Sequence, residues 1–147
     1  MKKVLSIFLV IVFLFTSGCF NLPKRSYTKE ELEDGLIKIE LVRIIASAPE
    51  RYIFETQKVF TLVEQEEVVE ELSKITFVQI TRPPTRQAPF YALLFIYSDY
   101  MVSFSLHFSI GKMDLNGKPI DSSSDEFFFP TGYNSELAKI IEKYLQK

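Results

Sequence analysis

Residues 76–130 carry four or five strand-like segments in succession, and no helical repeat separates them. Residues 90–99 are almost continuously apolar, which is typical of a central strand covered on both faces, or of one covered by helices on one face and by something outside this chain on the other. Residues 100–111 alternate between apolar and polar side chains, which predicts one buried face and one face in contact with water. Strands that follow one another without a long crossover pair antiparallel, so this succession predicts a largely antiparallel sheet.

A further pair of strands is expected upstream of this region. Residues 36–45 and 52–62 both carry apolar side chains at even spacing, which predicts a hairpin. The dipeptide Asn116-Gly117 is the strongest short signal for a tight hairpin turn, because both residues tolerate a positive φ. The proline-rich residues 83–89 lack backbone donors, so strand pairing is expected to stop there.

Two amphipathic helices complete the pattern. Thr61 and Glu64 form a capping box ahead of the first helix, and the second covers the C-terminal residues 134–147. Apolar side chains recur at helical spacing in both, at Val68, Leu72, Ile75, Leu137, Ile140, Ile141, Tyr144 and Leu145. The chain therefore predicts an α+β domain over residues 36–147. Its single twisted antiparallel sheet has about five to seven strands, both helices on one face and a partly solvent-exposed opposite face.

Composition excludes several classes of protein. The 147 residues are 47% hydrophobic and 24% charged, which is typical of one globular domain. The formal net charge is -2, and removal of residues 1–18 with Lys2 and Lys3 makes it about -4, which argues against nucleic-acid binding. One cysteine and one histidine form neither a disulfide nor a four-ligand zinc site. No metal or cofactor is expected.

The N-terminus has the layout of an export signal. Lys2 and Lys3 precede the apolar run Val4–Phe15, which is too short for a stable membrane span of about 20 residues. The small residues Ser17 and Gly18 follow, as signal peptidases require. Residues 1–18 are therefore predicted to be a signal peptide.

The segment Thr16-Ser17-Gly18-Cys19 resembles the lipobox of bacterial lipoproteins, with Thr16 where an aliphatic residue is usual. The resemblance implies that a signal peptidase recognises Thr16, Ser17 and Gly18 and cuts before Cys19. It also implies that Cys19 carries diacylglycerol and anchors the protein at the outer face of the membrane, since two acyl chains give durable binding. Cleavage at another bond and an uncleaved anchor are the alternatives.

A polar segment follows the cysteine. Residues 19–35 are expected to form a tether that spans at most about 50 Å when fully extended. Lys24 and Arg25 within it either contact anionic headgroups or lie in a solvated linker. Thr28 and Glu31 have the spacing of a capping box, which favours a brief helical turn.

Catalytic residues are sparse in this sequence. His107 is the only side chain that titrates near neutrality, and it shares a strand face with serines about 7 Å away, too far for direct contact. A solvent-facing histidine is therefore favoured over a hydrolase site. Asp114 and Asn116 begin an oxygen-rich stretch, but Lys118 and Pro119 do not fit a calcium loop.

Two features favour binding. Arg82 and Arg86 are candidate contacts for an anionic partner such as an envelope polymer or lipid headgroup. Tyr91, Tyr97 and Tyr100 are candidates for an interaction patch on the exposed sheet face, or are plain core residues. The leading hypothesis is a lipid-anchored, non-catalytic domain that binds a protein or envelope component. The alternatives are an envelope hydrolase using His107 and an accessory subunit of a membrane complex.

The order of elements also bears a resemblance. A strand-helix-strand unit followed by a meander and a C-terminal helix is similar to the YhfM-like group of small lipoproteins from Bacillus-type bacteria. The resemblance implies the same α+β fold class and an extracytoplasmic location. It implies no site residue.

Overall fold

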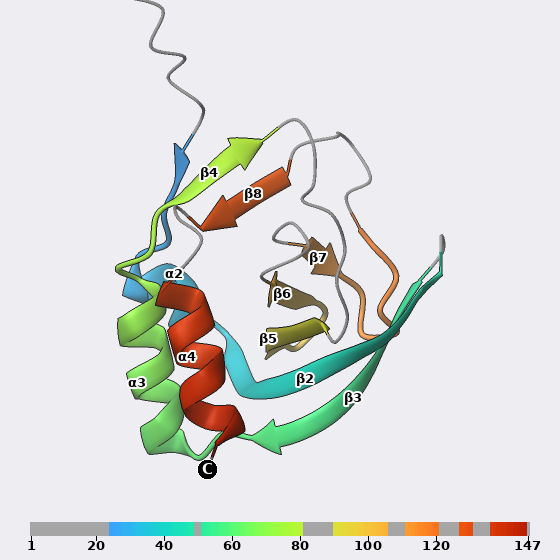
Figure 1. Ribbon diagram of the computed structural model, residues 1–147, viewed down its shortest axis with the longest axis horizontal. Coiled ribbons are helices and arrows are strands. Elements are labelled where there is room, and N and C mark those ends of the chain that lie inside the picture. The colour runs from blue at the N-terminus through green and yellow to red at the C-terminus, as the bar shows by residue number, and fades with distance from the viewer. Residues whose placement is uncertain are drawn as a thin grey trace, which may run out of the picture.

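The computed structural model describes residues 24–48, 51–80, 90–105, 111–120, 127–130 and 136–146. Three helices and eight strands lie within these ranges (Figure 1). In chain order they are β1 (Lys24–Arg25), α2 (Lys29–Glu33), β2 (Leu36–Ala48), β3 (Arg51–Val59), α3 (Leu62–Leu72), β4 (Phe77–Ile80), β5 (Phe90–Tyr97), β6 (Met101–Ser105), β7 (Gly111–Met113), β8 (Phe127–Pro130) and α4 (Glu136–Leu145).

The strands confirm the predicted α+β class and antiparallel pairing, and they fall into two hydrogen-bonded groups. A five-stranded sheet has the order β3-β2-β5-β6-β7, and a three-stranded sheet has the order β1-β4-β8. Every pairing between these strands is antiparallel. β4 and β5 are successive strands but belong to different sheets. The proline-rich residues 83–89, where pairing was predicted to stop, lie between them and outside the described residues.

The predicted hairpin is formed by β2 and β3, which are long and curved (Figure 1). Register shifts occur between Leu41 and Val42 and between Ile44 and Ala46. Such bulges bend a strand and increase its twist, which accounts for the curvature.

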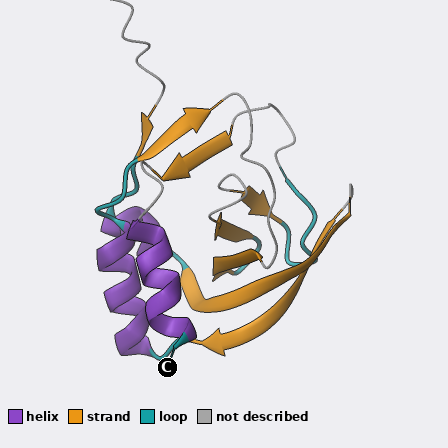
Figure 2. Ribbon diagram, in the orientation of Figure 1, coloured by secondary structure: helices purple, strands orange, loops and turns teal. Residues whose placement is uncertain are grey.

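Both long helices cover one face of the five-stranded sheet, as predicted, and Figure 2 shows the helices gathered on one side of the strands. The capping box of α3 is present, with the Thr61 side chain accepting from the Glu64 amide. The main core includes residues of both helices and of β2, β5 and β6, among them Val68, Leu72, Leu137, Ile141, Ile39, Leu41, Leu93, Phe95 and Phe104. Leu145 was predicted in the apolar stripe of α4, but it is 39% exposed at the end of that helix.

The opposite face of the sheet is also covered, which corrects two predictions. A second cluster of buried side chains lies there, formed by Val42, Ile44, Ala92, Leu94, Met101 and Met113. Ser103 and Ser105 were predicted to face water, but they are only 6% and 2% exposed. The sheet curves so that its two edges approach each other, and the concave face is therefore closed around this cluster.

Residues 24–35, which were expected to lie in a tether, are part of the folded domain. β1 pairs with β4, so that Arg25 lies opposite Phe77. Leu32 of α2 is 1% exposed within the main core, and Tyr27 packs against Phe77 and Phe104. The capping box predicted at Thr28 is present and begins α2. The sequence-local pattern missed this packing because its partners are about fifty residues away.

Candidate functional site

Most of the site residues predicted from the sequence lie outside the described residues. These are Thr16, Ser17, Gly18 and Cys19 at the N-terminus, Arg82 and Arg86 between β4 and β5, and His107 between β6 and β7. The contacts of the described residues therefore do not test the anchoring, anion-binding or hydrolase hypotheses at those positions.

The predicted tyrosine patch is not on an exposed sheet face. Tyr97 is buried, and its hydroxyl donates a hydrogen bond to the Leu32 carbonyl oxygen at 2.9 Å. Burial raises the pKa of Tyr97 to about 12. Tyr91 and Tyr100 are partly buried against the main core, and the Tyr100 ring stacks on Tyr97 with centroids 4.6 Å apart. The alternative of a core residue is therefore correct for Tyr97, whereas Tyr91 and Tyr100 lie at the edge of the core.

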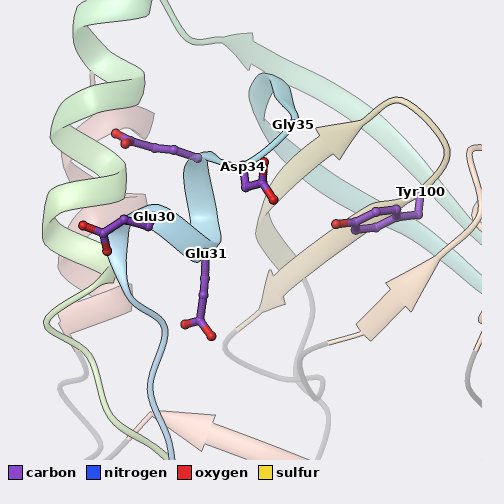
Figure 3. A pocket seen from close by; sticks show the side chains of 6 residues that line it. Glu30, Glu31, Asp34, Gly35 and Tyr100 are labelled. Carbon is purple, nitrogen blue, oxygen red and sulfur yellow. The ribbon is translucent and has the colours of Figure 1, made fainter.

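An open acidic depression of about 760 Å³ lies between α2 and Tyr100 (Figure 3). Its lining is formed by Glu30, Glu31, Glu33, Asp34, Gly35 and Tyr100. Tyr100 lies across the depression from α2, and the Lys112 ammonium is 4.2 Å from its ring centroid. The local negative charge and the aromatic wall are of the kind that attracts cations.

The carboxylates of this depression do not converge. Figure 3 shows the Glu30 and Glu31 side chains pointing in different directions. The Glu31 carboxylate accepts a hydrogen bond from the Thr28 backbone N–H at 2.7 Å, as part of the capping box. The Glu33 carboxylate lies 3.7 Å from the Lys29 ammonium. Within the described ranges, no group of three or more His, Cys, Asp or Glu side chains is placed to hold a metal ion. The depression is a solvent-exposed acidic surface.

A polar cluster between α3 and α4 has a structural role. Lys143 lies 3.3 Å from Glu67 and 3.0 Å from Glu71, and the Tyr144 hydroxyl donates to Glu67 at 2.9 Å. The hydrogen bond to Glu71 raises the pKa of Lys143 above its ordinary range. These contacts join the two helices over the core residues beneath them.

Glu64, the capping-box residue of α3, is likewise held by structural contacts. Lys58 of β3 donates to it at 2.8 Å, and the Thr61 amide donates at 3.0 Å. The Lys58 hydrogen bond is the main reason that the pKa of Glu64 falls to about 2. The Glu64 carboxylate is therefore ionised at neutral pH and bound at the start of α3.

Asp114 and Asn116, which begin the oxygen-rich stretch, lie in an ordinary turn after β7, whereas its later members Asp121, Asp125 and Glu126 lie outside the described residues. The Asp114 carboxylate accepts hydrogen bonds from the amides of Asn116 (2.8 Å) and Lys118 (2.9 Å), which lower its pKa. Gly117 has a φ of +83° and places the turn against β3. The hairpin turn predicted from Asn116-Gly117 is thus confirmed, and the Asp114 oxygens stabilise it.

The described fold begins at a basic edge. Lys24 and Arg25 form β1, the first strand of the three-stranded sheet, and both are exposed. The Arg25 guanidinium lies 4.7 Å from the centroid of the Tyr27 ring, which is itself held in the core. The pairing with β4 therefore holds the backbone of both residues against the domain, and the Tyr27 ring holds the Arg25 guanidinium.

Comparison with protein-family models, with curated proteins and with solved structures finds no match for this chain. Within the part of the chain that the structure describes, no helix is both long enough and apolar enough to cross a bilayer. A function is therefore inferred from the residues of this chain and their contacts.

Proposed function

We propose that the protein is a lipid-anchored binding domain, held at the outer face of the cytoplasmic membrane by acylated Cys19. The observation that carries this proposal is the order of a basic end, a short apolar run and the segment Thr16-Ser17-Gly18-Cys19. Two acyl chains on one cysteine hold a folded domain durably, because each buried CH₂ contributes about 0.8 kcal/mol.

The position of the fold along the chain supports this proposal. The first described element, β1, begins at Lys24, five residues after Cys19. Cleavage before Cys19 therefore removes none of the described helices or strands.

Binding is favoured over catalysis because, in the described part of the chain, the carboxylates and amines with shifted pKa values have structural partners. The pKa of Glu64 is lowered by Lys58, that of Asp114 by turn amides, and that of Lys143 is raised by Glu71. Perturbed groups in a catalytic site converge on a cleft, whereas these three stabilise a helix start, a turn and a helix pair.

The test is a comparison of Cys19→Ala with the control Ser98→Ala, which changes an exposed serine, in the native host. The wild type and the control are expected to fractionate with membranes and to incorporate a radiolabelled fatty acid. Cys19→Ala is expected to lose the label and leave the membrane fraction. A wild type that carries no label, or a Cys19→Ala chain that keeps it, contradicts the proposal.

Crosslinking in membranes followed by mass spectrometry of the captured protein identifies the bound component. If the captured protein forms a stoichiometric membrane complex with the chain, the chain is an accessory subunit, which is one of the two alternatives predicted from the sequence. The hydrolase alternative is tested separately with His107→Ala. This variant is expected to capture the same crosslinked component as the wild type.

A further inference from the structure

We propose that the β1 end of the domain faces the bilayer and contacts anionic phospholipid headgroups through Lys24 and Arg25. This inference rests on the acylation of Cys19 proposed above. It adds an orientation and a lipid-binding surface to an anchor that by itself specifies neither.

The short length of chain between Cys19 and the fold keeps β1 close to the membrane. Lys24 is five positions after Cys19, and at about 3.3 Å per residue this distance is at most about 17 Å. The tether of residues 19–35 expected from the sequence would have allowed about 50 Å. Because residues 24–35 are folded, the basic strand cannot move far from the headgroups.

Pairing with the core fixes the direction in which this strand points. Lys24 and Arg25 lie opposite Val78 and Phe77 of β4, and the Ser26 and Thr76 hydroxyl oxygens are 3.3 Å apart. Tyr27 packs edge-on against Phe104 with centroids 5.3 Å apart. The basic strand therefore cannot swing independently of the domain, and a contact between β1 and the bilayer orients the whole fold.

The distribution of charge favours the same orientation. The exposed basic side chains of β1 come first after the anchor, and the acidic residues of α2 follow them. Anionic headgroups attract juxtamembrane basic residues and repel carboxylates. Figure 1 shows β1, β4 and β8 at the end of the molecule opposite the C-terminal end of α4, so Gln146 would lie far from the bilayer.

The test measures energy transfer from the acylated protein in vesicles to an acceptor lipid. A donor dye is attached at Ser26→Cys in one sample and at Gln146→Cys in another, since the native thiol of Cys19 is blocked by the lipid. Vesicles contain either phosphatidylcholine alone or phosphatidylcholine with phosphatidylglycerol. Transfer is expected to be stronger from position 26, and the difference is expected to widen in the anionic vesicles.

Charge variants separate headgroup contact from simple proximity to the anchor. Each basic residue near an anionic surface favours contact by about fivefold, so Lys24→Gln with Arg25→Gln should reduce the ratio of contacting to non-contacting protein by about 25-fold. The control Lys118→Gln with Lys139→Gln removes the same charge from exposed positions elsewhere. It should leave the difference between the two dye positions unchanged.

Each outcome decides a different claim. Equal transfer from both positions, or a difference that ignores lipid charge, overturns the headgroup contact while the anchor stands. If the control Lys118→Gln with Lys139→Gln also loses the difference in energy transfer between positions 26 and 146, the specific role of Lys24 and Arg25 is overturned. A protein whose intact mass shows no acyl group contradicts the proposed function itself.

Discussion

The backbone N–H of Tyr52 donates a hydrogen bond to the carbonyl oxygen of Gly117 at 2.9 Å, and this contact joins the two edges of the five-stranded sheet. Tyr52 lies in β3, and Gly117 lies in the turn after β7, the strand at the other edge. An edge strand with free backbone donors can pair with another chain. The closing turn satisfies one such donor and covers the buried cluster on the concave face.

Replacement of Gly117 is expected to open this closure. In Gly117→Ala the new methyl group would lie against the Tyr52 carbonyl oxygen, well inside contact distance, at a φ of +83°. We expect a loss of about 2–4 kcal/mol in the free energy of unfolding, from left-handed strain plus the displaced turn. Urea denaturation followed by circular dichroism measures it.

Gly35 provides the matched control for this experiment. Its φ is +72°, but a Cβ there meets no atom within 4 Å. Gly35→Ala should therefore cost only the strain of the left-handed backbone, about 1–2 kcal/mol. Equal losses in the two variants would contradict the view that the turn packs closely on β3.

Truncation of Leu32 tests whether residues 24–35 belong to the fold. Leu32→Ala should lower the free energy of unfolding by about 2–4 kcal/mol, because this side chain is 1% exposed in the core. Leu145→Ala, at a leucine that is 39% exposed, should cost below about 1 kcal/mol. If Leu32→Ala is as mild as its control, the segment behaves as the tether that the sequence suggested.

Removal of one hydroxyl group tests the polar contact between α3 and α4. Tyr144→Phe keeps the ring, which lies 4.7 Å from that of Phe60, but loses the hydrogen bond to Glu67. The expected loss is about 1 kcal/mol by urea denaturation. Lys74→Gln removes only an exposed ion pair with Glu70 and should cost about 0.5 kcal/mol or less. A neutral Tyr144→Phe would show that the hydroxyl does not stabilise the helix pair.

Glu64 should make stability depend on acid pH. Its pKa is lowered from 4.5 to about 2 in the folded protein, chiefly by Lys58, so its contribution is fully present above about pH 5. As the pH falls from 5 towards 2, the carboxylate gains a proton and that contribution is lost. The difference in unfolding free energy between wild type and Glu64→Gln should shrink over this interval. A difference that stays constant between pH 7 and pH 2.5 would contradict the role assigned to Lys58.

Local features of the sequence were sufficient for part of this fold. The capping residues Thr61 and Glu64 and the apolar spacing of α3 and α4 located both helices, because helix contacts join residues three and four apart. The dipeptide Asn116-Gly117 located its turn, because a tight turn also depends on residues that are close together in the sequence. The antiparallel sheet followed from the order of the strands.

Contacts between residues that are far apart in the sequence could not be predicted from such local patterns. Alternation predicts which side chains share a sheet face but not what covers that face, so Ser103 and Ser105 were wrongly expected in water. The pairing of Lys24 and Arg25 with β4 depends on residues about fifty positions away. The proposed anchor at Cys19 rests on a short linear segment of the kind that a peptidase recognises, so the sequence alone is enough to propose it. The proposed orientation of β1 also depends on the pairing of β1 with β4.

The central claim is that the mature chain begins at a diacylated Cys19. Intact and peptide mass spectrometry of protein extracted from membranes with detergent tests it most directly. We predict an N-terminal peptide that starts at Cys19 and carries the mass of the diacylglyceryl group, with or without a further acyl chain on the amine. A chain that keeps residues 1–18, or that starts at another residue with an unmodified Cys19, would contradict the claim.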